Sequence, residues 1–372
     1  MKKVKVIFFI YQMGAGGAAR TMLNILNNMD RTKFMPVLVT LNYNGSYESY
    51  IEEDIKFIKL NTKRLRSAVL PLAKVIRREK ADIVFSTIPN YNTIAILARI
   101  ISFTRAKNIV REAAFLGGSF RADMKLRAMG MLYKLTGKVI ALSNGVKENI
   151  VTRYKVKPEK IRVIYNPVDV DSITAHMETG EIARENKYIF QDNAKVIITA
   201  GRLVKDKDHE TLISAFAKVN QKMNARLVIL GEGELEGKLK QQAAKLHLQD
   251  NIHFLGFQQN PYVYFKHADL FVLSSLREGF GHVLTEALAT GTPIVSTNCR
   301  PGAMEVLDGG KYGILCKTGD ADDMAEKITK TLKLDDEKTE EIIDNGIRRA
   351  NEFHARKIVK EYEETFLNEH RN

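Results

Sequence analysis

The chain has 372 residues, of which 45% are hydrophobic and 27% are charged. This composition is typical of a soluble globular protein, and the length favours two domains over a single core. No apolar run approaches the roughly 20 residues that a membrane-spanning helix needs. The two cysteines, Cys299 and Cys316, exclude a disulfide framework and a cysteine metal site, which favours a reducing cytoplasm.

The formal net charge of +13 is concentrated in the first half of the chain. Residues 1–167 carry 30 Lys and Arg against 11 Asp and Glu, a net charge of +19, whereas the remaining residues carry 27 against 33, a net charge of −6. A surface charged only for solubility would not divide in this way. We therefore expect the first half to face an anionic partner, such as phospholipid, a lipid-linked phosphate or nucleic acid.

In chain order, the first half alternates short apolar runs with helical patterns. The run Val6–Tyr11 leads into glycines, so it predicts a buried first strand rather than a signal peptide. Strands are predicted at Val4–Ile10, Pro36–Leu41, Ile83–Ser86, Asn108–Val110 and Lys138–Leu142. Helices are predicted at Ala18–Asn28, Ser67–Arg78, Thr93–Ser102 and Asn144–Tyr154. This alternation indicates βαβ units and a parallel sheet.

The first half ends with the block Ile161–Val168, and the polar segment His176–Ala194 predicts a linker. The alternation then restarts. Strands are predicted at Lys195–Ala200, Ala225–Leu230, Ile252–Leu255, Leu270–Leu273 and Pro293–Thr297, and helices at His209–Asn220, Leu235–Leu246 and Gly281–Thr290. A last helix, Ala355–Asn368, is long enough to return to the first domain. The predicted fold class is α/β, with two Rossmann-like domains at residues 1–170 (with 355–372) and 171–354.

The strongest functional signal lies in Arg277–Glu305. Glu278 lies on a glycine-rich turn after a predicted strand, and Glu286 follows eight residues later in the next helix. Glycines let backbone amides approach a ligand at the start of a helix, where free N–H groups and the helix dipole attract anions. A carboxylate on the turn can accept hydrogen bonds from sugar hydroxyls, and one on the helix can hold a ribose diol. We prefer this interpretation to a pair of solvated carboxylates.

This segment resembles the E-x7-E motif of family 4 of the retaining glycosyltransferases, which have the GT-B fold with two domains facing each other across a donor-binding cleft. The N-terminal GAGGAAR is similar to the GGAER-type loop of that family, with Ala19 in place of the usual Glu. Other blocks resemble the family in the same order: Ile161–Asp169 (the interdomain junction), Gly201–Lys207, Ile229–Leu235, Phe254–Phe257 and Tyr312–Asp320. Each block alone is weak, but the ordered set is specific and covers nearly the whole chain.

The resemblance implies a role for each matching residue. Arg202 and Lys207 would pair with the diphosphate of a nucleotide-sugar donor and offset the charge on the leaving phosphate. Glu286 would hold the ribose, and Glu278 would bind hydroxyls of the transferred sugar. The other implied donor-binding residues are Gly16, Gly17, Phe257, Gly279, Phe280, Gly281, His282, Val283 and Leu284. Gly16 and Gly17 would let the N-terminal loop close over the diphosphate, or they form a simple tight turn.

Retention does not require a protein nucleophile in this family, and none is evident here. Many relatives carry a His after a strand in the middle of the first domain, where this chain has Arg111 and Glu112. Glu112 can accept a hydroxyl proton or orient the acceptor, so it is a candidate catalytic residue beside Glu278, Arg202 and Lys207. It can equally be ion-paired to Arg111 as scaffolding, and the sequence leaves both interpretations open.

Nothing in the sequence requires a metal or a cofactor. Asp169 and Asp171 match the DxD signature of metal-dependent glycosyltransferases, but their place in the junction favours coincidence. Five histidines of the second half lack metal-ligand spacing: His209, His247, His253, His267 and His282. Asp320 and its neighbours are expected to cap a helix that begins near Ala321.

Two segments of the first half are basic and amphipathic. Thr62–Lys80 has apolar residues at helical spacing interrupted by Pro71, and a core-facing stripe explains it at least as well as a membrane surface. Ser119–Lys138 interleaves Met, Leu and Tyr with Lys and Arg, which favours docking on an anionic membrane. The acceptor would then be held in the membrane, as in a polyprenyl-diphosphate-linked glycan or a lipopolysaccharide core.

The expected function is metal-independent, retaining transfer of a hexose or N-acetylhexosamine from a nucleotide sugar to a lipid-linked or surface-glycan acceptor. The phrase CRPGAMEVL resembles enzymes of bacterial capsule or lipopolysaccharide synthesis and favours UDP as the nucleotide. The protein is expected to be cytoplasmic and peripheral on the inner face of the plasma membrane. A nucleotide-sugar epimerase of the same fold is the main alternative. A nucleic-acid-binding protein would explain the charge but not the motifs, which lie in the acidic half.

Overall fold

The computed structural model describes residues 2–14 and 16–371 and divides the chain into two compact units. The first unit is Met1–Val168 with His354–Asn372, and the second is Asp169–Phe353. The polar segment His176–Ala194 is not a linker between them. It lies inside the second unit, where it forms the end of helix α6 (Val170–Thr179) and a short 3-10 helix at Arg184–Phe190.

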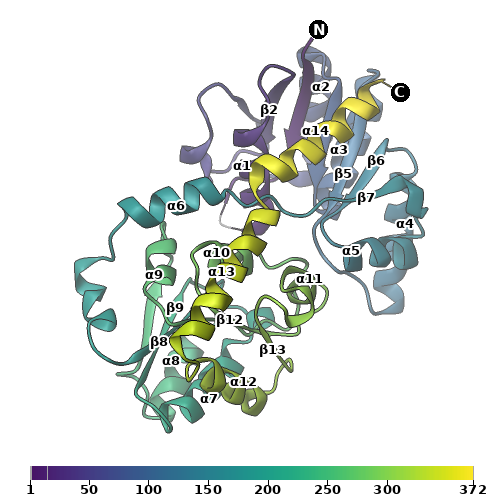
Figure 1. Cartoon of the computed structure of the whole chain (residues 1–372). Coiled ribbons are helices and arrows are strands. Elements are labelled where there is room, and N and C mark those ends of the chain that lie inside the picture. The colour runs from purple at the N-terminus through teal and green to yellow at the C-terminus, as the bar shows by residue number, and fades with distance from the viewer. Residues whose placement is uncertain (1, 15, 372) are drawn as a thin grey trace. The chain divides into compact units, whose positions relative to one another are not determined.

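The first unit is built on a seven-stranded parallel sheet in the order β3-β2-β1-β4-β5-β6-β7 (Figure 1). Its strands are β1 (Val4–Phe9), β2 (Phe34–Thr40), β3 (Lys56–Lys59), β4 (Ile83–Thr87), β5 (Lys107–Glu112), β6 (Lys138–Ala141) and β7 (Ile161–Val163). Its helices are α1 (Gly17–Asn28), α2 (Val69–Glu79), α3 (Pro89–Ser102), α4 (Phe120–Tyr133), α5 (Asn144–Asn149), a π-helical turn at Ile150–Tyr154, and α14 (Ala355–Arg371).

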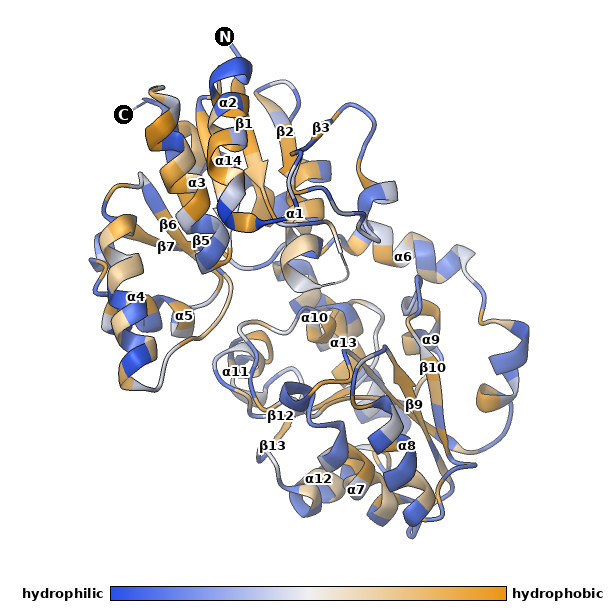
Figure 2. Ribbon diagram, turned by 180° about the vertical axis from the view of Figure 1, so that it is seen from behind, coloured by the Kyte–Doolittle hydropathy of each residue, from blue (hydrophilic) through white to orange (hydrophobic). Residues whose placement is uncertain are grey.

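Helices cover both faces of this sheet because alternate residues of each strand point to opposite sides. In β1, Val6 and Phe8 pack into one apolar cluster with residues of α1 and α14. Ile7 and Phe9 pack into another cluster with residues of α2 and α3. Strand β1 is therefore apolar on both faces, as Figure 2 shows. This is the pattern of a buried parallel sheet.

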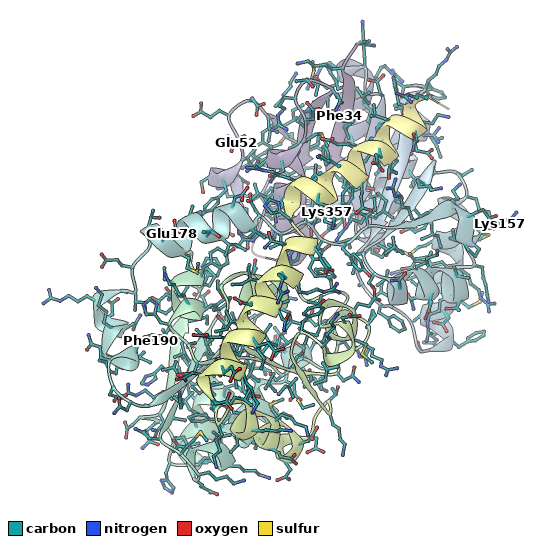
Figure 3. The ribbon with its side chains drawn as sticks, in the orientation of Figure 1. Phe34, Glu52, Lys157, Glu178, Phe190 and Lys357 are labelled. Atoms are coloured by element: carbon teal, nitrogen blue, oxygen red, sulfur yellow. The ribbon has the colours of Figure 1, made fainter. Side chains whose placement is uncertain are left out.

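The last helix packs within the first unit, as predicted. Phe366 of α14 contacts Phe8 and Phe34, with ring centroids 6.0 Å and 6.3 Å apart. Figure 3 labels Phe34 at the start of β2. Glu363 accepts a hydrogen bond from the backbone N–H of Asp30 at 2.6 Å. Full burial of each large apolar side chain contributes about 1.5–3 kcal/mol, so α14 is an integral part of the unit.

The second unit contains a six-stranded parallel sheet in the order β10-β9-β8-β11-β12-β13. Its strands are β8 (Lys195–Ala200), β9 (Ala225–Leu230), β10 (Ile252–Gly256), β11 (Leu270–Leu273), β12 (Ile294–Thr297) and β13 (Ile314–Cys316). Its helices, besides α6, are α7 (His209–Asn220), α8 (Glu236–Lys245), α9 (Tyr262–Lys266), α10 (His282–Ala289), α11 (Gly302–Val306), α12 (Ala321–Thr331) and α13 (Asp336–Glu352). Its main apolar cluster joins β8 and β9 to α7, α8 and α12.

Within the basic segment Thr62–Lys80, residues Val69–Glu79 form the core-facing helix α2. Leu72 and Ile76 of α2 are fully buried, so the apolar stripe packs on the sheet. Pro71 does not interrupt the helix because it lies in the first turn, where its missing N–H costs no helical hydrogen bond. Among the described residues, no helix is both long and apolar enough to cross a membrane.

Candidate active site

The sheet order of the second unit brings the predicted site residues together. Strand β8 lies beside β11, and the connections from these two strands run to opposite ends of the sheet. Ligands of open α/β sheets bind beyond the carboxyl ends of the strands at such a switch point. The loop after β8 carries Arg202 and Lys207, and the loop after β11 carries Glu278. Residues about 70 positions apart in sequence therefore meet at one sheet edge.

Lys207 and Glu278 form an ion pair that joins these two loops, between Lys207 Nζ and Glu278 Oε1. The same carboxylate oxygen accepts a hydrogen bond from Ser275 Oγ at 2.9 Å. Ser274 Oγ donates to the backbone carbonyl of Lys207 at 2.7 Å and fixes the loop that carries it. The side chains of Lys207 and Glu278 remain 22% and 14% exposed. A ligand can therefore reach both charges, and an anion can compete with Glu278 for the ammonium group.

The loop after Glu278 leads directly into α10. Gly281 has a φ of 88° and precedes the first helical residue, and no acidic residue lies in the first turn of α10. The loop is held by Gly302, whose N–H donates to the Glu278 carbonyl at 3.0 Å. A Cβ at Gly302 would lie 2.7 Å from the Phe280 carbonyl oxygen, so only glycine permits this approach. The start of α10 thus places the positive end of the helix dipole beside Glu278.

Glu286 lies on the second turn of α10 and is partly buried. Tyr262 of α9 donates a long hydrogen bond to Glu286 Oε1 at 3.5 Å. The predicted Val283, Leu284 and His282 lie between this carboxylate and the glycine turn, in the first turn of the same helix. The E-x7-E residues therefore flank one helix start.

Arg202 and Phe257 are exposed at the carboxyl edge of the same sheet. Phe257 follows β10 and is 46% exposed. The Arg202 side chain makes no hydrogen bond or ion pair with any other residue that the structure describes. Gly231, after β9, lets the loop after β8 pass closely, because a Cβ there would lie 2.1 Å from the Gly201 carbonyl oxygen. The loop after β8 thus carries Lys207, which is paired with Glu278, and Arg202, which pairs with no other described residue.

Two other polar side chains near Lys207 are held in their neutral forms. Burial, with a smaller effect of the Lys207 charge, lowers the pKa of His209 to about 4, so the imidazole is neutral at physiological pH. Burial raises the pKa of the Cys299 thiol to about 11. Neither residue is therefore poised for acid–base or nucleophilic chemistry at neutral pH.

The predicted residues Gly16 and Gly17 lie in the first unit, at the start of α1. Both are exposed, and the preceding Ala15 lies outside the described residues. Gly16 has an extended backbone, and a Cβ built on it would meet nothing within 4 Å. Its conformation and packing therefore do not demand glycine, and the space beside it is open to a ligand.

Glu112 does not lie on an open surface. It is fully buried at the end of β5, where Tyr133 and Asn92 donate to Oε1 and Tyr154 donates to Oε2, the latter at 3.2 Å. Burial raises its pKa to about 7. The alternative ion pair with Arg111 is not formed either. The Arg111 guanidinium donates instead to Asn166, to Tyr362 Oη at 3.1 Å and to Thr87 Oγ1 at 2.9 Å.

This burial weighs against the candidate catalytic role of Glu112, which stays a prediction. A substrate hydroxyl would have to displace one of three internal donors to reach the carboxylate, so this arrangement favours a structural role.

The predicted cap is confirmed at Asp320, which accepts from the N–H groups of Asp322 and Asp323 at the start of α12. Asp169 likewise caps α6, so the DxD residues lie at a helix start.

Sequence reasoning missed Ser274 and Ser275, whose hydroxyls hold Lys207 and Glu278 in place. Their position directly after a buried strand, at the ligand-binding edge, is the signal that could have found them.

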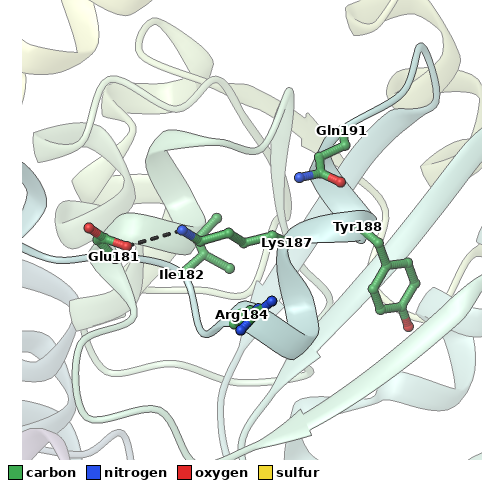
Figure 4. Close-up of a pocket in the computed structure, with 6 residues that line it drawn as sticks. All are labelled: Glu181, Ile182, Arg184, Lys187, Tyr188 and Gln191. Carbon is green, nitrogen blue, oxygen red and sulfur yellow. Dashed lines mark hydrogen bonds and ion pairs between the residues drawn. The ribbon is translucent and has the colours of Figure 1, made fainter.

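A separate cavity of about 540 Å³ lies in the second unit (Figure 4). It is lined by Glu181, Ile182, Arg184, Lys187, Tyr188 and Gln191, none of which was predicted as a site residue.

Comparison with known proteins extends over both units. The model of "Glycosyltransferase Family 4" matches residues 15–172, and that of "Glycosyl transferases group 1" matches residues 182–349. An N-acetylgalactosamine-N,N'-diacetylbacillosaminyl-diphospho-undecaprenol 4-alpha-N-acetylgalactosaminyltransferase of Campylobacter jejuni is 29% identical, covering 96% of this chain and 98% of the relative. The capsular polysaccharide biosynthesis glycosyltransferase CapM of Staphylococcus aureus is 30% identical over 62% of each chain.

Solved structures of the same fold agree with the two-sheet architecture. Anabaena HepE in complex with UDP and glucose has a TM-score of 0.84 at 22% identity, covering 98% of this chain and all of that one. A glycosyltransferase of Rickettsia africae has a TM-score of 0.82 at 20% identity, with full coverage of both chains. These likenesses establish the GT-B fold, and the two matched models together span most of the sequence. The chain therefore belongs to the family 4 glycosyltransferases.

Proposed function

We propose that this glycosyltransferase moves a hexose or N-acetylhexosamine from a UDP-sugar to a lipid-linked glycan, without a metal and with retention of anomeric configuration. The observation that carries this proposal is the cluster of Lys207, Arg202 and the start of α10 at one sheet edge. Two cations and a helix N-terminus are the groups that stabilise a leaving diphosphate. Glu278 and Glu286 add acceptors for sugar and ribose hydroxyls. UDP is supported by the UDP-bound structural relative.

We assign the donor to the second unit and the acceptor to the first. All of the charged donor residues lie in the second unit, whereas the excess of Lys and Arg lies in the first. The name of the Campylobacter relative describes an acceptor on diphospho-undecaprenol, which is both anionic and membrane-held. A basic first unit suits an acceptor of that kind.

The first unit also presents a surface suited to an anionic membrane. In α4, Leu126, Met129 and Tyr133 face the core. The other side of the segment exposes Phe120 and Met131, at 82% and 63%, together with four cations: Arg121, Lys125, Arg127 and Lys134. The end of α3 adds Phe103, at 87% exposure, and Arg99 Nη2 links the two helices by donating to the Leu135 carbonyl at 3.0 Å. Exposed aromatic and basic side chains together favour the headgroup region of a bilayer.

The transfer reaction is tested by UDP release from UDP-glucose, UDP-galactose and their N-acetylamino forms, with and without a polyprenyl-diphosphate-linked sugar. We expect release that requires the acceptor, survives EDTA and gives an α-linked product by NMR. Interconversion of UDP-sugars without an acceptor would establish the epimerase instead. A β-linked product would contradict retention, and loss of activity in EDTA would contradict metal independence.

The membrane surface is tested by vesicle sedimentation of the triple variant Lys125→Gln, Arg127→Gln, Lys134→Gln. Each cation near an anionic surface contributes about 1 kcal/mol, so we expect affinity for phosphatidylglycerol vesicles to fall roughly 100-fold. The matched control removes three exposed lysines of α8 in the second unit: Lys238, Lys240 and Lys245. Equal loss in both variants, or none in the first, would contradict the assigned surface.

A further inference from the structure

Three tyrosines form a stack in the first unit that none of the donor residues uses. Tyr11 follows β1, Tyr43 follows β2, and Tyr91 lies in the first turn of α3 after β4. The Tyr11 ring stacks on the Tyr43 ring with centroids 4.9 Å apart and planes at 26°, and on the Tyr91 ring at 5.9 Å and 20°. All three side chains are partly exposed. We call these residues the tyrosine platform.

The tyrosine platform lies at the switch point of its sheet. In the order β3-β2-β1-β4-β5-β6-β7, the connections leave β1 and β4 toward opposite ends. Tyr11 and Tyr91 follow these two strands, at the edge where open α/β sheets bind ligands. Ile88, a β-branched residue with a φ of 76°, lies between β4 and Tyr91, directly before Pro89. Such backbone strain persists where the surrounding structure enforces it, and it is concentrated at functional sites.

A cationic segment is attached to the tyrosine platform. The hydroxyls of Tyr43 and Tyr11 donate to the Lys63 carbonyl at 3.2 Å and 3.5 Å, and Lys63 Nζ lies 5.9 Å from the Tyr43 ring centroid. Arg64 and Arg66 follow, and all three cations are exposed.

The charge of this segment is not neutralised by any residue that the structure describes. Within residues 2–14 and 16–371, no carboxylate pairs with Lys63, Arg64 or Arg66. The neighbouring Lys59, in contrast, pairs with Glu48 at 2.7 Å. The tyrosine platform is therefore bordered by positive charge that is available to a ligand.

We propose that the tyrosine platform, with Lys63, Arg64 and Arg66, binds a glycosyl phosphate, which is the sugar–phosphate part of the acceptor. A tyrosine presents a flat apolar face and a polar hydroxyl tip, which suit the C–H face of a sugar ring and its hydroxyl rim. Guanidinium groups form forked hydrogen bonds with phosphate oxygens, and the ammonium group adds a point charge. This inference rests on the proposed function, because it names the acceptor part that the first unit holds.

Binding is tested by calorimetric titration with N-acetylglucosamine 1-phosphate in saturating UDP, which blocks the nucleotide-sugar site. We expect wild-type protein to bind this probe more tightly than free N-acetylglucosamine or inorganic phosphate. Tyr43→Leu should weaken binding about tenfold, whereas Tyr43→Phe, which keeps the ring, should stay within about threefold. Arg64→Gln with Arg66→Gln should weaken binding of the phosphate probe about tenfold and leave free N-acetylglucosamine unchanged.

Controls separate this site from the donor site and from misfolding. Lys157→Gln removes an exposed cation of the same unit, labelled in Figure 3, and should bind as wild type. Circular dichroism checks that Tyr43→Leu is folded. In transfer assays, the Tyr43 and Arg64/Arg66 variants should raise KM for the acceptor while kcat and UDP affinity stay unchanged.

Three outcomes would overturn the inference. If Tyr43→Leu binds the probe as tightly as the wild type does, the tyrosine platform is not part of the binding site. If the wild-type protein does not bind the probe, the proposed site does not exist. Tighter binding of a short single-stranded oligonucleotide than of the glycosyl phosphate would assign the surface to nucleic acid instead. If UDP does not bind but the probe binds in a Tyr43-dependent way, the proposed function fails and the glycosyl phosphate site remains. If UDP binds and the probe does not, only this inference fails.

Discussion

Replacement of Glu112 by Gln should change how the stability of the first unit depends on pH. Glu112 is fully buried, and burial raises its pKa from the ordinary 4.5 to about 7. Between these two values the folded protein keeps a proton that the unfolded chain has lost, so the wild-type stability falls as pH rises through this window. The amide of Gln mimics the protonated acid and cannot ionise. Tyr154 can then accept a hydrogen bond where it now donates one.

The size of the effect follows from the two pKa values. A group with these values loses roughly 2–3 kcal/mol of folding stability between pH 5 and pH 8. Urea unfolding of both proteins at the two pH values measures this directly, because other titrating groups cancel in the difference. We expect Glu112→Gln to gain about 2–3 kcal/mol on the wild type between pH 5 and pH 8. Glu159→Gln, at an exposed position of the same unit, is the control and should gain nothing.

A pH-independent difference between Glu112→Gln and the wild type would refute this reasoning. It would mean that the three donors to the carboxylate outweigh burial and keep Glu112 ionised.

The remaining predictions concern the donor site and one close backbone contact. Lys207→Met should reduce the transfer rate by about 10²–10³-fold. It should change the free energy of unfolding by no more than about 1 kcal/mol, because the Lys207–Glu278 pair is partly solvated. An unchanged transfer rate would show that Lys207 does not bind the diphosphate. Glu286→Ala should weaken UDP binding about tenfold in calorimetry, and equal loss for inorganic diphosphate would contradict a ribose contact. Gly130→Ala should lower the free energy of unfolding, measured in urea, by about 1–3 kcal/mol, because the added Cβ would lie 1.8 Å from the Tyr154 carbonyl oxygen. The control is Gly237→Ala in helix α8, where a Cβ meets nothing within 4 Å, so this change should be neutral or stabilising.

The regular elements and the donor residues were predictable because their signals are local. Short apolar runs and helical patterns predicted β1, β8 and α7, and the glycine turn with its two carboxylates predicted the Glu278–Glu286 segment. The edge strand β3 was missed because its sequence, KFIK, is short and carries lysines, as edge strands commonly do. Pro71 was taken as an interruption because its place in the first turn of α2 depends on where the helix begins.

The environment of Glu112 could not be predicted, since it depends on residues from three other elements. Asn92 of α3, Tyr133 of α4 and Tyr154 of the π-helical turn approach the carboxylate only in the folded unit. The tyrosine platform is equally non-local, because Tyr11, Tyr43 and Tyr91 meet through the strand order alone. Sequence spacing finds residues that follow strands, whereas sheet topology decides which of them become neighbours.

The central claim is that the second unit binds a UDP-sugar without a metal, and thermal-shift titration with UDP, GDP and ADP, each with EDTA or magnesium, tests it most directly. A ligand at about 100 times its dissociation constant adds roughly 2.7 kcal/mol of stability. The account predicts a selective rise in Tm with UDP that EDTA does not remove and that Glu286→Ala reduces. No rise with UDP, or an equal rise with all three nucleotides, would contradict it.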